Sequence, residues 1–96
     1  MAKQTFAVTY RFVPNIQERR EPHRPAHFEY LRQALEAGHL VLAGPLEDPY
    51  DGGLLLMEFD DRGQAMTWVS GDPYVKAGLV NELSVRTYTV LVSRYS

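Results

Sequence analysis

Residues 39–59 read HLVLAGPLEDPYDGGLLLMEF, which are two apolar, strand-like runs separated by residues that favour turns. The first run, His39 to Ala43, is closed by Gly44 and Pro45, and the second is Leu54 to Phe59. Asp, Pro and Gly crowd the segment between them, where Pro fixes φ and Gly accepts a positive φ. The middle of the chain is therefore predicted to hold two successive strands.

A strand and a helix are predicted before this stretch. Residues 6–12 alternate between large apolar residues and Ala, Thr or Arg, which is the period-two pattern of a strand. Pro25 suits the first turn of a helix and Gly38 suits its end. One face of that helix would carry His27, Leu31, Ala34 and Leu35, at helical spacing.

A helix, a short helical turn and a last strand are predicted after residues 39–59. Asp60 or Asp61 can cap a second helix, in which Ala65, Trp68 and Val69 share a face. Asp72 and Pro73 then suit the start of a short helical turn, as N-cap and first residue. The last strand is predicted over Glu82 to Ser93.

This order, βαββαβ, predicts a ferredoxin-like α+β fold. Right-handed crossovers place both helices on one face of a four-stranded antiparallel sheet. With 96 residues the chain is too short for a second core, so residues 1–96 are expected to form a single domain.

The central strands are apolar on both sides. Leu55, Met57 and Phe59 would face one way, and Leu54 and Leu56 the other. Since two helices cover only one face, the other face needs a second cover, and a second copy of the chain packed sheet to sheet supplies it. A monomer whose open face tolerates apolar residues is the alternative.

Composition narrows the function classes. The chain has no cysteine, which excludes a disulfide scaffold, a cysteine-ligated metal site and a thiol nucleophile. A net charge of −2 with scattered basic residues argues against nucleic-acid binding. No apolar stretch approaches the roughly 20 residues of a membrane span and the start is strand-like, so a cytoplasmic protein is expected.

Histidines are the first candidates for chemistry. His23 and His27 have the i, i+4 spacing of a helical metal pair, but Pro25 between them favours a helix that leaves His23 outside. No metal site is predicted. His27 shares the apolar face of its helix, where it is either a hydrogen-bonded core residue or, with a carboxylate beside it, a general base or acid.

Asp72 is the leading carboxylate partner. It can cap a helical turn and hold His27 at once, because a carboxylate that accepts backbone N–H bonds is kept ionised and rigid. Arg11, Arg20 and Arg24 could bind a substrate carboxylate, although arginines are usually exposed. The charged segment that starts at Gln17 is expected to be a solvated connection. Tyr10, Trp68 and Tyr74 could line a pocket, although aromatic residues usually pack in the core.

Three short motifs in order resemble a known family. They are Arg24-Pro25-Ala26-His27, Ala43-Gly44-Pro45 and Asp72-Pro73-Tyr74, and together they are similar to the YciI-like (YCII-related) proteins. The resemblance implies a dimeric α+β barrel and an active site of one histidine and one aspartate, which map onto His27 and Asp72. The family is similar to muconolactone isomerase-type enzymes and has a branch resembling chloromuconolactone dehalogenase.

The function expected from these residues is that of a small-molecule enzyme, a lyase, isomerase or hydrolase acting on a small polar or acidic compound. His27 would move a proton, Asp72 would orient it, and Arg24, Arg11 and Tyr74 would bind the substrate. No metal or organic cofactor is required. The alternative is a non-catalytic dimer that binds a metabolite or serves only as structure, with His27 and Asp72 as a structural pair.

Overall fold

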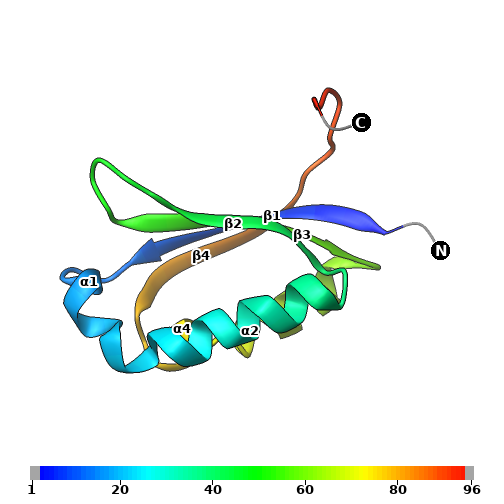
Figure 1. Ribbon diagram of the computed structural model, residues 1–96. Coiled ribbons are helices and arrows are strands. Elements are labelled where there is room, and N and C mark those ends of the chain that lie inside the picture. Colours follow the sequence, from blue (N-terminus) through cyan, green and yellow to red (C-terminus); the bar gives the residue numbers. More distant parts are fainter. Residues whose placement is uncertain (1–2, 95–96) are drawn as a thin grey trace.

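The computed structural model describes residues 3–94, which form a four-stranded antiparallel sheet with helices on one face (Figure 1). The strands are β1 (Gln4–Phe12), β2 (Leu40–Leu46), β3 (Gly52–Phe59) and β4 (Val80–Thr87). Their spatial order is β2-β3-β1-β4, so β1 and β3 are central. The predicted ferredoxin-like α+β fold is confirmed.

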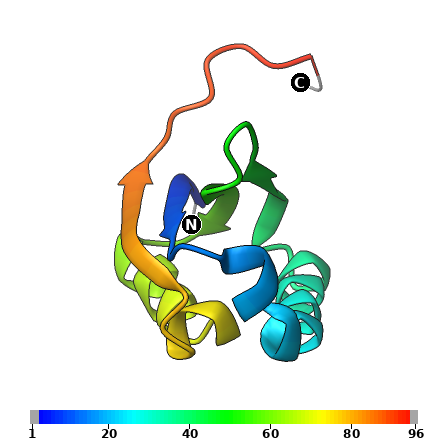
Figure 2. The ribbon, with the colours of Figure 1, turned by 90° about the vertical axis from the view of Figure 1, so that its left-hand side faces the viewer.

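The two main helices lie side by side under the sheet (Figure 2). They are α2 (Arg24–Glu36) and α3 (Arg62–Ser70), and shorter turns are α1 (Ile16–Arg19), the 3-10 helix η1 (Glu21–His23) and α4 (Pro73–Lys76). Asp61 starts α3 by accepting a hydrogen bond from the backbone N–H of Gln64. Within residues 3–94 no helix has the length and apolar character to cross a membrane.

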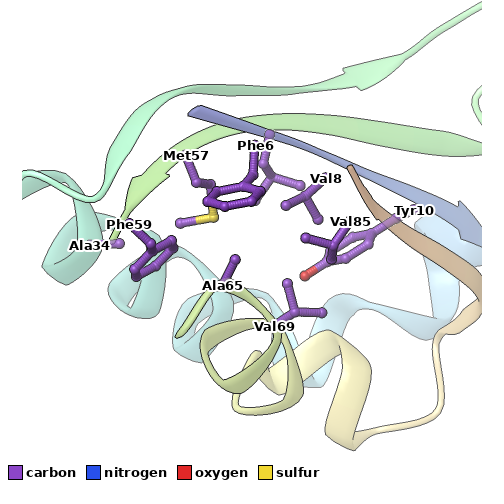
Figure 3. Close-up of a cluster of buried hydrophobic side chains, with 10 residues drawn as sticks. Phe6, Val8, Tyr10, Ala34, Met57, Phe59, Ala65, Val69 and Val85 are labelled. Carbon is purple, nitrogen blue, oxygen red and sulfur yellow. The ribbon is translucent and has the colours of Figure 1, made fainter. Parts of the chain in front are cut away.

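The core fills the space between the sheet and these helices (Figure 3). Alternate residues of the two central strands point into it, which is why the period-two patterns predict its sheet side. Burying each such side chain contributes about 1.5–3 kcal/mol. The buried cluster consists of Phe6, Val8, Tyr10, Ala34, Leu55, Met57, Phe59, Ala65, Val69 and Val85.

Strand β2 differs from its predicted form. It continues through Pro45 to Leu46, because an edge strand tolerates a residue without an N–H. Leu40 pairs with Met57 whereas Leu42 pairs with Leu56, so one extra residue forms a bulge. Leu40 and Leu42 therefore face opposite sides of the sheet, and simple alternation fails here.

The last strand is shorter than predicted, and Leu35 of α2 lies on the exposed side of the helix instead of the predicted covered side. Strand β4 ends at Thr87 rather than Ser93, because Thr87 pairs with Phe6 and β1 begins only two residues earlier, at Gln4. Residues 88–94 leave the sheet on the side away from the helices (Figures 1 and 2). Leu35, expected on the covered face of α2, is 57% exposed, because it lies about 100° around the helix from the buried Ala34.

Candidate active site

Asp72 lies at the centre of the candidate site and has no exposed surface. It is the N-cap of α4 and accepts a hydrogen bond from the backbone N–H of Tyr74 at 2.9 Å. Pro73, which lacks an N–H, occupies the first helical position, so Tyr74 supplies the first free donor. The local sequence Asp-Pro-Tyr therefore holds the carboxylate rigidly.

Two side chains from other elements complete the surroundings of this carboxylate. The Tyr10 hydroxyl donates to Oδ2 of Asp72 at 2.8 Å, and Nδ1 of His27 lies 2.7 Å from Oδ1. Burial, and then the negative charge of Asp72, raise the pKa of Tyr10, so its hydroxyl keeps its proton and acts as a donor. Asp72 thus has three donors, and a buried carboxylate needs such partners.

His27 is held on two sides. Its ring stacks on Tyr74 with the centroids 3.6 Å apart and the planes 7° from parallel. Because Asp72 accepts at Nδ1, the neutral imidazole carries its proton on Nδ1 and leaves the Nε2 lone pair free. An imidazole oriented by a carboxylate, with its second nitrogen free, can act as a general base and then as a general acid.

A cavity of about 190 Å³ adjoins His27, between the sheet and the start of α2. Burial raises the pKa of Tyr74, one of its aromatic wall residues, which keeps that hydroxyl neutral. Arg20 and Arg24 also line the cavity. It is a concave, largely apolar site with a few polar groups, which is the usual form of a small-molecule site.

Three of the predicted site residues line this cavity, one supports it, and one lies elsewhere. His27, Arg24 and Tyr74 line it, and Asp72 lies behind His27. Arg11 is on the opposite face of the sheet, is 64% exposed and lies 3.7 Å from Glu82. Since side chains alternate along a strand and Tyr10 faces the helices, Arg11 must face away. The prediction that Arg11 binds the same substrate is wrong.

The sequence names Arg20 as a possible ligand for a carboxylate but places it in an exposed connection, and it does not indicate Tyr50. The segment predicted as a solvated connection folds into α1 and η1, and the Arg20 side chain between them is only 13% exposed. Arg20 donates to the hydroxyl of Tyr50, which lies in the turn between β2 and β3. The position of Tyr50 within a turn signal gave no indication of this contact. Trp68 does not line the cavity; its ring stacks on Tyr30.

Comparison with known proteins places the chain in a family. Residues 5–89 match the YCII-related domain. The chain belongs to this family. This YCII-related chain is 34% identical over 80 residues to Protein YciI of Escherichia coli O6:H1, covering 74% of this chain and 82% of that protein. It is 29% identical over 85 residues to an uncharacterized protein of Haemophilus influenzae, covering 79% and 87% respectively.

A solved structure shares the fold of the YCII-related chain. It is the 5-chloro-2-hydroxyhydroquinone dehydrochlorinase of Burkholderia phenoliruptrix AC1100, in complex with 2,5-dihydroxybenzoquinone. The TM-score is 0.77 at 22% sequence identity, covering 88% of this chain and 93% of the other. At this identity the likeness establishes the common fold.

Proposed function

We propose that this protein is a cofactor-independent enzyme in which His27 and Asp72 transfer a proton on a small polar or acidic compound, as a lyase, isomerase or hydrolase. The observation that carries the proposal is the pairing of Nδ1 of His27 with the fully buried Asp72 while the same imidazole lines a cavity. The matching fold of a dehydrochlorinase supports an enzymatic role.

The mechanism requires only this chain's own groups. Nε2 of His27 removes a proton from the bound compound, and the ionised Asp72 stabilises the imidazolium that forms. The electron pair left behind moves within the substrate, either to expel a leaving group or to accept the proton again at a second atom. Arg24 would stabilise negative charge on the substrate, and Tyr74 holds the imidazole flat throughout.

Chloride release from 5-chloro-2-hydroxyhydroquinone, the compound in the neighbour's name, is the first assay. Loss of HCl takes one proton and one chloride and involves no external electron acceptor. We expect His27→Gln to lower kcat by about 10²–10⁴-fold, the range for loss of a general base. His23→Gln, a histidine that does not line the cavity, should leave kcat unchanged.

Two results would contradict the proposal. One is chloride release by the wild type no faster than in buffer. The other is a His27→Gln variant with the wild-type rate, which would favour the alternative of a metabolite-binding or structural module. Asp72 caps α4 in either case, so the variant at His27 is the decisive one.

A homodimer packed sheet to sheet also belongs to the proposal. Leu42 and Leu46 are half exposed on the face away from the helices. In the pairing of β2 with β3, Leu42 lies opposite the half-buried Leu56 and Leu46 lies opposite Gly52. The segment after β4 leaves on the same side, where Leu91 is 88% and Val92 93% exposed. Exposed apolar side chains that gather on one side of a sheet favour an interaction site there.

Light scattering at micromolar concentration tests the dimer. Two copies per particle are expected for the wild type, and Leu42→Lys should shift the particle to one copy. A wild-type monomer under these conditions would contradict the proposal.

The cytoplasmic location and the single-domain organisation over residues 1–96 stay predictions.

A further inference from the structure

Two arginines line the cavity without a hydrogen-bonded carboxylate. The Nε atoms of Arg20 and Arg24 are buried and make no hydrogen bond to any described residue. Glu21 lies 3.8 Å from Nε of Arg20, beyond hydrogen-bond distance, and its own side chain is mostly exposed. A buried guanidinium whose donors are not all paired is costly, so both groups are suited to a ligand that supplies a further acceptor.

Both guanidinium groups are fixed in place by aromatic rings. The Cζ atom of Arg20 lies 5.2 Å from the centroid of Tyr50, and that of Arg24 lies 5.1 Å from the centroid of Phe28. Arg20 also donates to the Tyr50 hydroxyl. Contacts of this kind orient a cation but bring no full negative charge to it, and within residues 3–94 Arg20 has beside it only the mostly exposed Glu21, 3.8 Å from its Nε. Among the described residues that line the cavity none is acidic, and the negative charge of Asp72 is already engaged with His27.

The shape of the cavity favours a flat ring. Phe12 and Tyr50 present rings within 21° of parallel, and the stacked pair of His27 and Tyr74 forms a second flat surface. Its volume, about 190 Å³, compares with the roughly 150 Å³ of an apolar cavity that holds benzene. A molecule with one six-membered ring and one or two polar substituents matches this size.

We propose that Arg20, which the sequence places in a charged connection, joins Arg24 in binding a planar, single-ring anion whose acidic oxygen is a carboxylate or a quinone enolate. This inference rests on the proposed function, because it names the substrate class of the same cavity. It adds a binding role for the segment before α2: α1 and η1 carry Arg20 into the cavity, and Tyr50 holds it there.

Calorimetric titration of the full chain with four small probes tests the inference. Benzoate carries a carboxylate, 2,5-dihydroxybenzoquinone carries enolate oxygens, benzamide is the neutral counterpart of benzoate, and cyclohexanecarboxylate is an anion without a flat ring. We expect at least one of the two flat anions to bind about tenfold tighter than benzamide and than cyclohexanecarboxylate. Which of the two binds tighter identifies the oxygen chemistry.

Variants locate the binding groups. Arg20→Gln should weaken binding of the flat anion by about tenfold or more, the loss expected for a hydrogen bond between charged groups. Arg20→Lys, which keeps the charge but not the fork of donors, should bind at an intermediate strength. Arg19→Gln, an exposed neighbour that does not line the cavity, should bind within about twofold of the wild type.

The inference is overturned if neither flat anion binds, if benzamide binds as tightly as both, or if Arg20→Gln and Arg20→Lys both bind like the wild type while remaining folded. Cyclohexanecarboxylate that matches benzoate would refute the flat ring. His27→Gln separates this inference from the proposed function: it should abolish turnover, whereas adding Arg20→Gln to it should still weaken binding of the flat anion by about tenfold. If the protein binds the flat anion through Arg20 but releases no product, the proposed reaction is wrong and the binding role of Arg20 stands.

Discussion

Replacing Tyr10 by Phe removes one hydroxyl from the interior and leaves the ring in place. In the wild type that hydroxyl donates to Oδ2 of Asp72 at 2.8 Å, at a point with no access to solvent. Without it, one oxygen of a buried carboxylate has no donor. A hydrogen bond to a charged group is worth about 1.5–3 kcal/mol, so we expect Tyr10→Phe to lower the free energy of unfolding by that amount.

Two other tyrosines supply matched comparisons. The Tyr30 hydroxyl donates to a neutral acceptor, the carbonyl oxygen of Trp68, at 2.7 Å. Tyr30→Phe should therefore cost only about 0.5–1.5 kcal/mol. Tyr88 is half exposed, and Tyr88→Phe should change stability by less than about 0.5 kcal/mol. The expected order of destabilisation is Tyr10, then Tyr30, then Tyr88.

Urea unfolding at one fixed protein concentration measures all three variants, because self-association would otherwise shift the apparent stability. For a domain of this size about 1 kcal/mol corresponds to roughly 4–8 °C in Tm, so thermal melts resolve the same order. If Tyr10→Phe cost no more than Tyr30→Phe, the Asp72 carboxylate would not depend on Tyr10, and the argument from its burial would fail.

Three further outcomes follow from other contacts in the structure. Asp72→Ala leaves three donors without an acceptor and should cost about 3–5 kcal/mol in urea unfolding, whereas Asp61→Ala, at the exposed cap of α3, should cost about 1 kcal/mol. Because burial raises the pKa of Tyr10 above its ordinary 10.0, stability is full below about pH 10 and falls as the pH rises, by up to about 1.4 kcal/mol per pH unit. Urea unfolding above about pH 10 should show a shallower fall for Tyr10→Phe than for the wild type; equal slopes would contradict this. Gly52→Ala would place a Cβ 2.5 Å from the backbone oxygen of Tyr10 and should cost about 1–3 kcal/mol, while Gly44→Ala, with open space at its Cβ, should be nearly neutral in the same melts.

Periodicity predicts the parts of this fold that depend on one strand or helix alone. Residues 6–12 alternate, and the side chains of Phe6, Val8 and Tyr10 are buried as that alternation requires. The same alternation places Arg11 on the other face, so it already argues against Arg11 as a neighbour of His27. That wrong prediction came from treating residue type apart from strand geometry.

The periodicity of one segment does not predict features that depend on its pairing or contact with another element. The bulge between Leu40 and Leu42 is defined by pairing with β3, and the end of β4 is set by where β1 begins. The inward position of Arg20 depends on Tyr50, some 30 residues later. The charged residues around Arg20 predict an exposed loop. The contact that holds Arg20 in the cavity wall is with Tyr50, which is distant in the sequence, so no local pattern indicates it.

The contact between His27 and Asp72 is partly predictable from local sequence and partly dependent on a second element. The beginning of α2 and the cap of α4 are each predicted from a few residues. The contact between His27 and Asp72 joins residues 45 positions apart, so it was predicted only because Asp72 was the leading carboxylate candidate and because the family resemblance implied the pair. The cap and the proposed proton-transfer role share one carboxylate, so a loss of turnover in an Asp72 variant does not tell the two roles apart.

His27 separates the two roles. A glutamine there can still donate an N–H to Asp72, which preserves a partner for the buried carboxylate, yet it offers no imidazole nitrogen to take a proton. If Asp72 is present only to cap α4, His27→Gln leaves both folding and turnover intact. If the pair moves protons, the same variant folds and loses turnover, and the difference between these results assigns the function of the site.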